Sequence, residues 1–305
     1  WEARERWLAR FAPIGLLLLP AVWATGVVLG ASGVFWALGT RPWRDAVVLA
    51  GSSFTTLGFR SADDLPSLLT AVAVAVLGLG LVALLISFLP TIYGAFSRRE
   101  AAVAKLHLRA TGADGVAEPA TLLIRAHLVG GLVQLSEVWA EWENWFVELE
   151  ETHTSFPMLV FFRSPVPERS WITSAGLALD TAALYSSTVA LDRHPRAALM
   201  IRTGTLALRR INDQLGFAYD PDPAPTDPIS ISREEYLEVY ERLCAAGVPV
   251  RSRREQAWAD FAGWRVNYDV PLLSLAAFVE APPAPWSSDR GRITRPAPKR
   301  RRRRP

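Results

Sequence analysis

The five residues Thr55 to Phe59 (Thr-Thr-Leu-Gly-Phe) form a short stretch of polar and glycine character between two long uncharged segments. A cation that leaves water must be surrounded by oxygen atoms at close range, and a ring of backbone carbonyls can replace its hydration shell. Gly58 permits the unusual dihedral angles that such a strand needs, because it has no Cβ. The hydroxyl of Thr56 adds an oxygen at the inner end. One chain supplies one strand, so a closed ring needs several copies, and we expect four.

This stretch resembles the selectivity filter of the potassium channel superfamily, in which Thr-x-Gly-(Tyr or Phe)-Gly follows a short pore helix. The resemblance covers residues 11–97 and is motif-specific only in the filter. It implies a channel with two membrane helices per subunit, a homotetramer through which potassium or other monovalent cations pass passively. It implies the permeant ion as the only ligand and no cofactor. The residues that it implies for ion binding are Thr55, Thr56, Leu57, Gly58 and Phe59.

Two other interpretations of the motif are weighed against this one. The filter of Trk/Ktr-type potassium transporters is similar, but those chains carry four filter repeats and this chain carries a single copy. An ordinary loop between two membrane helices is the plain alternative. Non-helical backbone at membrane depth is tolerated only where it is buried in protein or lines a water-filled cavity.

The outer mouth departs from the family pattern. Arg60 stands where the family has its closing glycine, and Asp63 and Asp64 follow it. Four guanidinium groups aimed at a shared axis would repel an approaching cation. We therefore expect either that Arg60 turns aside to pair with Asp63 or Asp64, or that the pore conducts poorly or with loose selectivity. The ion preference is left open on this ground.

Three segments must position the filter. The first uncharged run predicts a membrane helix over residues 11–38, because a span needs about 20 apolar residues; a signal peptide would have a shorter apolar core. Residues 43–54 are predicted as the pore helix, and residues 66–92 as the second membrane helix. In that second helix the gating candidates are Gly78, Gly80 and Pro90. Plain helix packing by these residues is the alternative.

The predicted fold class is an all-α membrane protein with a re-entrant pore helix and a mostly helical cytoplasmic domain. Arginine and lysine concentrate before the first span and after the second, which places both termini in the cytoplasm. The predicted domains are a transmembrane pore domain over residues 1–97, a cytoplasmic helical domain over 98–280 and a disordered basic tail over 281–305. The localisation that follows is the cell membrane, with the lipid bilayer as a partner.

The cytoplasmic half shows helical patterns. A long helix is expected to start at Glu118-Pro119 and to carry an apolar heptad seam. An intersubunit bundle and the core of its own domain are the two uses of this seam that we consider. The seam residues are Leu128, Leu132, Leu135, Trp139, Trp142, Phe146 and Leu149.

Three shorter segments also carry expectations. Phe156–Phe162 is expected to be a buried strand or a segment on the inner leaflet. Capping boxes are predicted at Ser232 and Ser252. The basic run Lys299–Arg304 is expected to bind the headgroups of anionic lipids, and no nucleic-acid partner is expected.

No enzyme constellation is evident. The four histidines are scattered without metal-ligand spacing, Cys244 is the single cysteine, and no Gly-x-Gly-x-x-Gly motif follows a strand. The rival to a channel is a membrane-anchored sensor or scaffold whose pore-like domain does not conduct, and Arg60 is the feature that favours it.

Overall fold

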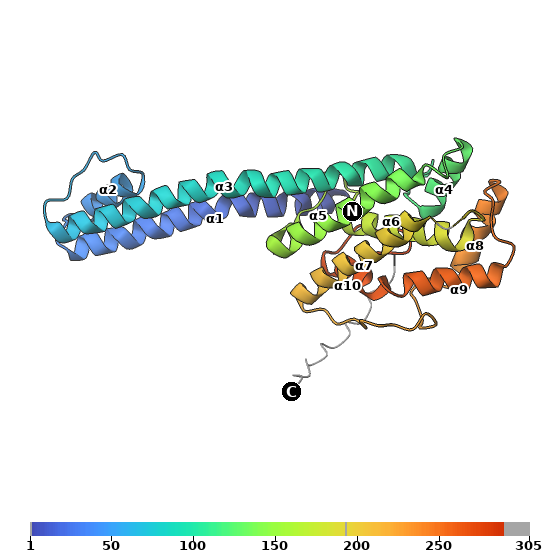
Figure 1. The fold of residues 1–305 in the computed structure, drawn as a ribbon. Helices are drawn as coiled ribbons and strands as arrows, with labels where there is room; N and C mark the ends of the chain where they lie inside the picture. Colours follow the sequence, from blue (N-terminus) through green and yellow to red (C-terminus); the bar gives the residue numbers. More distant parts are fainter. Residues whose placement is uncertain (1, 193, 290–305) are drawn as a thin grey trace, which may run out of the picture. The chain divides into compact units, whose positions relative to one another are not determined.

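The computed structural model describes residues 2–192 and 194–289, and this part of the chain is helical, with two isolated β-bridges and no longer strand (Figure 1). The contacts divide the chain into two compact units, one formed by Trp7–Ala95 and one that contains the residues from Phe96 onward. The helices are α1 (Glu2–Ala37), α2 (Trp43–Phe54), α3 (Leu65–Ala110), α4 (Pro119–Leu128), α5 (Leu135–Ser155), the 3₁₀ helix η1 (Pro157–Phe161), α6 (Trp171–Thr188), α7 (Pro195–Leu215), α8 (Arg233–Ala245), α9 (Arg254–Arg265) and α10 (Asp269–Phe278).

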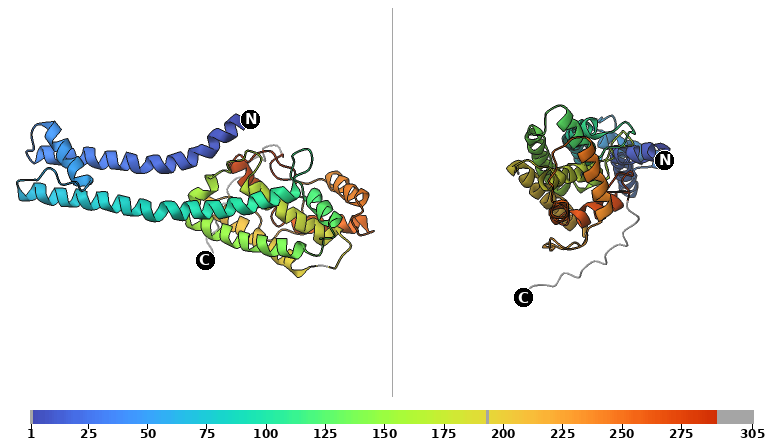
Figure 2. Two further views of the ribbon diagram at one scale, coloured as in Figure 1. Left: turned by 90° about the horizontal axis from the view of Figure 1, so that it is seen from above. Right: turned by 90° about the vertical axis from the view of Figure 1, so that its right-hand side faces the viewer.

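The first unit contains two helices that are long and apolar enough to cross a membrane, α1 from Trp7 and α3. They run antiparallel (Figure 1), and they diverge as they leave the end at which α2 lies (Figure 2, left). Only 6% of the most apolar window of α1 and 11% of that of α3 is buried by the rest of the chain. Apolar surface of this extent is unfavourable in water, which is the physical basis for considering both helices as membrane spans.

Helix α2 has the predicted bounds, residues 43–54, and it is held by a small apolar cluster. Phe35 of α1, Leu49 of α2 and Val74 of α3 are buried in this cluster, together with three alanines. Gly78 of α3 allows the closest approach, since a Cβ built on it would lie 1.9 Å from the carbonyl oxygen of Phe54. The end of α2 therefore rests directly on the backbone of α3.

The second unit is built around α6, of which every residue from Trp171 to Thr188 is buried. Most of its residues are small or aliphatic, so neighbouring helices can pack on all sides of it. Helices α4, α7, α9 and α10 contact α6, and α5 packs along α7. A helix that is apolar all round is expected in the core of a domain.

A buried ion network fixes the carboxyl-terminal part of this unit. Asp180, the only charged residue of α6, accepts two hydrogen bonds of 2.6 Å from Arg265 of α9. Arg265 also donates to Asp269 at 2.7 Å and to the carbonyl of Trp286 at 2.7 Å. Loss of one partner from a buried pair costs about 3–5 kcal/mol, because the remaining charge is left without compensation. The network therefore ties residues near 286 to the central helix.

The prediction of one long helix that starts at Glu118-Pro119 is wrong. Helix α4 ends at Leu128, Gly130 has a φ of +68°, and α5 starts only at Leu135. From Leu132 to Leu149 the seam residues are buried in the core of their own unit, whereas Leu128 is exposed. The seam is therefore used inside the domain, and these side chains are not available for an intersubunit bundle.

Three smaller expectations also differ from the structure. Phe156–Phe162 is not a strand, because it contains η1; Leu159 and Val160 of this helix are buried, whereas Met158 and Phe161 are exposed, and its position on the inner leaflet stays a prediction. The capping box at Ser232 is present with both hydrogen bonds, but Ser252 caps nothing, since α9 starts after Arg253. The expected disordered tail includes residues 281–289, yet Trp286 is buried. The basic run Lys299–Arg304 lies outside the described residues.

Candidate functional site

The candidate site is the stretch Thr55 to Phe59, which begins where α2 ends. Thr55 still has helical backbone angles (φ −81°, ψ −1°), and its N–H donates to the carbonyl of Gly51. The Thr55 hydroxyl donates to the same carbonyl at 2.7 Å. The chain turns at Thr56, whose φ is +56°. The N–H of Thr56 donates to the carbonyl of Ser53 at 3.0 Å, so the amides that follow α2 still turn back to the last turn of the helix.

Ser52 accepts three hydrogen bonds from the backbone amides of residues 57–60. Its carbonyl accepts the N–H of Leu57 at 3.1 Å and the N–H of Gly58 at 3.4 Å. Its hydroxyl accepts the N–H of Arg60 at 3.3 Å. Ser52 is fully buried, so these bonds lie on the protein side of the stretch.

The amide directions fix the carbonyl directions. These peptide bonds are trans, and in a trans peptide the C=O points opposite to the N–H of the next residue. Since the N–H groups of Leu57, Gly58 and Arg60 face Ser52, the carbonyls of Thr56, Leu57 and Phe59 point away from it. Within the described part of the chain these three oxygens accept no hydrogen bond.

The backbone angles explain how several carbonyls come to lie on one side. In an ordinary β-strand of L-residues, successive carbonyls alternate between the two sides. Thr56 at +56° and Gly58 at +67° are left-handed, whereas Thr55 at −81° is right-handed. In a backbone nest, such alternation turns successive N–H groups to one side. Here the N–H groups of Leu57 and Gly58 both face Ser52, and the carbonyls of the same peptide groups face the opposite side. A left-handed conformation costs roughly 1–2 kcal/mol at a non-glycine residue such as Thr56, so this loop is held there by its surroundings.

Arg60 does turn aside, but its partner differs from the predicted ones. Its guanidinium lies 2.8 Å from a carboxylate oxygen of Asp45 in the first turn of α2. Asp64 instead accepts the N–H of Ser67 at 3.1 Å at the start of α3, and hydrogen bonds from Ser67 lower the pKa of its carboxyl. Asp63 is exposed. The Arg60–Asp45 pair joins the residue that follows the stretch to the first turn of α2.

Of the three gating candidates, the structure brings only Gly78 to the site. Gly78 contacts the backbone of Phe54, the residue before Thr55. Gly80 faces open space, since a Cβ added there would meet no heavy atom within 4 Å. Pro90 lies inside α3, which continues to Ala110.

Sequence reasoning did not identify Ser52 and Asp45 as the residues that contact the stretch and Arg60. The signal for Ser52 was its polarity after the apolar run Ala46–Ala50 of a short helix, since a buried hydroxyl needs a hydrogen-bond partner. The signal for Asp45 was weaker, since an acidic residue in the first turn of a helix is favourable there in any case.

The arrangement offers a cluster of unpaired backbone oxygens beside the carboxyl end of a helix, where the peptide dipoles concentrate partial negative charge. Such a set of oxygens suits a cation. Among the described residues no group of three or more His, Cys, Asp or Glu side chains could hold a metal ion. No family model matches this chain, and neither a curated protein nor a solved structure matches it.

Proposed function

We propose that the protein is a membrane-embedded pore that passes potassium or other monovalent cations passively. It does so as a homotetramer with four copies of the segment Thr55–Phe59 around one axis; we call this segment the carbonyl strand, although it pairs with no β-strand among the described residues. The observation that carries the proposal is the pairing pattern of this strand. Its amides are tied back to Ser52, and its carbonyls at Thr56, Leu57 and Phe59 accept no hydrogen bond within the described residues. Unpaired carbonyl oxygens of this kind can replace the water shell of a dehydrated cation.

The helices around the strand support the proposal. Helix α2 is flanked by two candidate spans, and its carboxyl end leads directly into the strand. In this position the helix dipole favours a cation in front of the strand. The exposed apolar faces of α1 and α3 are available to lipid and to neighbouring copies.

The charges at the mouth are compatible with cation entry. Arg60 is the residue that argues against conduction, because its charge would repel a cation. Its ion pair with Asp45 offsets this charge and draws the guanidinium toward the start of α2. The proposal therefore does not require the loss of Arg60.

Four copies are required because a single strand surrounds only one side of an ion. The measurement of subunit stoichiometry in detergent or nanodiscs is the first test of this requirement. Four subunits per particle support the pore, whereas a monomer excludes it.

Rubidium uptake into proteoliposomes tests conduction directly. The purified wild-type chain is expected to admit rubidium into vesicles loaded with potassium. Gly58→Val should abolish this uptake, because a β-branched residue is strongly disfavoured at a φ of +67°. Gly33→Ala on α1 is the matched control, since a Cβ at Gly33 meets no atom within 4 Å.

The rival function is a membrane-anchored sensor or scaffold with a non-conducting pore-like domain. It predicts no rubidium uptake from purified tetramers and no recovery of uptake in Arg60→Gly. Uptake that Gly58→Val abolishes and Gly33→Ala retains excludes this rival.

A further inference from the structure

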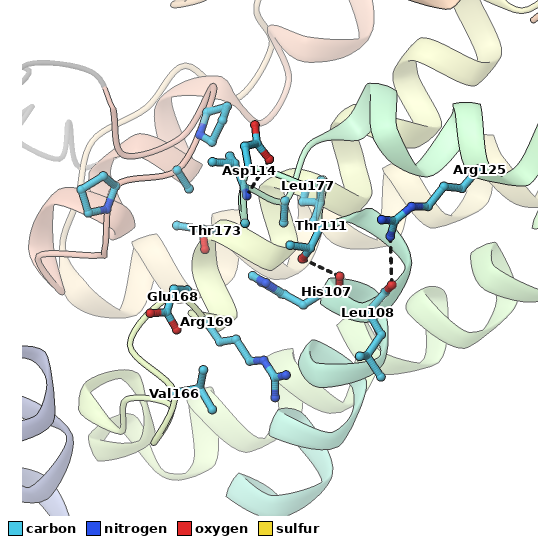
Figure 3. Close-up of a pocket in the computed structure, with 16 residues that line it drawn as sticks. His107, Leu108, Thr111, Asp114, Arg125, Val166, Glu168, Arg169, Thr173 and Leu177 are labelled. Atoms are coloured by element: carbon cyan, nitrogen blue, oxygen red, sulfur yellow. Dashed lines mark hydrogen bonds between the residues drawn. The ribbon is translucent and has the colours of Figure 1, made fainter. Parts of the chain in front are cut away.

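A cavity of about 850 Å³ lies in the second unit, and the proposed pore makes no use of it (Figure 3). Its wall comes from the end of α3, the turn that follows α3, Arg125 of α4, the loop before α6, the first turns of α6 and residues 283–285. The volume lies within the range of about 300–1,000 Å³ that is usual for small-molecule sites. The cavity is therefore large enough for a small organic ligand.

Arg169, in the loop before α6, supplies an unused positive charge to this cavity. Its guanidinium is half-buried and has no hydrogen bond or ion pair within the described part of the chain. By contrast, Arg125 on the same wall donates to the carbonyls of Leu108 and Arg109 at 3.2 and 3.3 Å. A guanidinium offers five donors in a planar fork that matches a carboxylate or a phosphate. Among the residues that line the cavity, Arg169 is therefore the group best suited to bind an anion.

His107 faces the same space (Figure 3). Its Nε2 lies 3.2 Å from the hydroxyl of Ser174. Burial, and then the nearby charge of Arg169, lower the pKa of the imidazole to about 4. The ring is therefore neutral at pH 7, and it offers a hydrogen bond without a second positive charge.

Two carboxylates limit the charge that the cavity accepts. Asp114 is exposed at the rim, and one of its oxygens accepts the N–H of Val116 at 3.0 Å. Glu168 is also exposed and lines the cavity. Both would repel a polyanion more strongly than an anion with one charged group.

Apolar side chains also line the cavity, beside the hydroxyl groups of Thr111 and Thr173. Leu108, Val116, Val166 and Leu177 line the cavity, together with two prolines of the segment 283–285. Because the aliphatic side chains and the guanidinium share one wall, an occupant with one charged end and an apolar body satisfies both.

We propose that this cavity binds a small organic anion, whose carboxylate or phosphate pairs with Arg169 and whose apolar part packs against Leu108, Val116 and Leu177. The site is built wholly from the second unit. The proposal does not rest on conduction by the first unit and is tested separately from it.

The test uses the full-length chain in nanodiscs and isothermal titration with four probes. Phenyl phosphate carries both the anionic group and an apolar ring, and it is expected to bind with a Kd of about 1 mM or lower. Inorganic phosphate, which lacks the ring, should bind at least about tenfold more weakly. Benzyl alcohol and benzylamine, which lack the negative charge, should show no saturable binding.

The variants locate the binding. Arg169→Gln should weaken binding of phenyl phosphate by about tenfold or more, as expected for a lost charge-assisted interaction. Arg202→Gln is the matched control, because this exposed arginine on α7 does not line the cavity. Val116→Trp, which fills the space without a change of charge, should also weaken binding.

Three results would overturn the proposal. The first is no saturable binding of phenyl phosphate to the folded wild-type chain. The second is equal binding of benzylamine or benzyl alcohol, which would reject an anion site. The third is affinity that stays at the wild-type level in both Arg169→Gln and Val116→Trp, which would place the binding elsewhere.

Discussion

The substitution Gly78→Ala gives a sharp test of how α3 supports the end of α2. A Cβ at this position would lie 1.9 Å from the oxygen and 2.9 Å from the carbon of the Phe54 carbonyl. Contacts shorter than 3.0 Å are essentially never seen for a real Cβ. The carbonyl must therefore move by more than about 1 Å, which is a large displacement in a close-packed region. Since Phe54 immediately precedes Thr55, the movement displaces the whole carbonyl strand.

Two opposing effects determine the change in the free energy of unfolding of Gly78→Ala. Overpacking of a well-packed contact costs about 1–3 kcal/mol. Replacement of glycine by alanine inside a helix stabilises the folded state by up to about 1 kcal/mol. Because the clash is with backbone and not with a flexible side chain, the cost lies at the upper end. We expect a net loss of about 2 kcal/mol in Gly78→Ala.

Gly80→Ala is the matched control on the same helix. No heavy atom lies within 4 Å of its added Cβ, so only the helix-propensity gain remains. Thermal unfolding in nanodiscs, followed by circular dichroism, should show a lower Tm for Gly78→Ala and an unchanged or higher Tm for Gly80→Ala. Rubidium uptake should fall only in Gly78→Ala. A Gly78→Ala variant with the wild-type Tm would refute the packing role and leave gating as the remaining interpretation of Gly78.

Three further predictions concern separate parts of the chain. Asp45→Asn releases the guanidinium of Arg60 from its ion pair at 2.8 Å, so rubidium uptake should fall, and the added change Arg60→Gln should restore it. Trp142→Asp places a carboxylate at a buried core position, so near-UV circular dichroism should show loss of tertiary structure at a cost of about 4 kcal/mol or more. For His107, burial and then a nearby arginine lower the pKa to about 4, against 6.5 for the free side chain. The folded state thus binds fewer protons than the unfolded state between these values, and the free energy of unfolding should fall by as much as about 3 kcal/mol as pH drops from 6.5 to 4. Burial and then Arg99 lower the pKa of His153 as well, so this group adds to the loss in the same direction.

The controls for these three predictions are simple. Uptake at the wild-type level in Asp45→Asn would show that the ion pair does not affect conduction. A Trp142→Asp chain that keeps its near-UV spectrum would contradict the core position. His107→Gln retains a partner for Ser174 and removes the titration, so its stability should vary less with pH between 4 and 6.5. An equally steep pH dependence in this variant would reject the assignment to His107.

The lengths of the uncharged runs and the residues that begin and end helices predict the three helices of the first unit. The bounds of α2 are correct because Pro42 precedes the helix and a polar turn follows it, and both are local signals. The two uncharged runs predict the apolar helices for the same reason, since length and charge are readable without a partner. The helices are nevertheless longer than the predicted spans, because α1 begins at Glu2 and α3 continues to Ala110.

The features that sequence reasoning missed depend on dihedral angles or on distant partners. Ser52 acts through a turn that brings back the amides of Leu57, Gly58 and Arg60, and no periodic pattern encodes this turn. The heptad spacing continues regularly from Leu128 to Leu135, although α4 ends at Leu128 and Gly130 has a left-handed backbone. The spacing therefore does not reveal the break between α4 and α5.

Long-range contacts are equally hidden. The Asp180–Arg265 pair joins residues 85 positions apart. The cavity at Arg169 is lined by several separate segments, and neither feature can be inferred from spacing.

The central claim is that backbone oxygens of the Thr55–Phe59 strand coordinate a permeant cation. Anomalous diffraction from crystals of the full-length protein grown with thallium, a heavy analogue of potassium, tests it directly. The account predicts anomalous peaks on a fourfold axis, within coordination distance of the carbonyls of Thr56, Leu57 and Phe59 from four subunits. A fully occupied crystal that shows no peak at these carbonyls, or a strand that lies away from the axis, would contradict it.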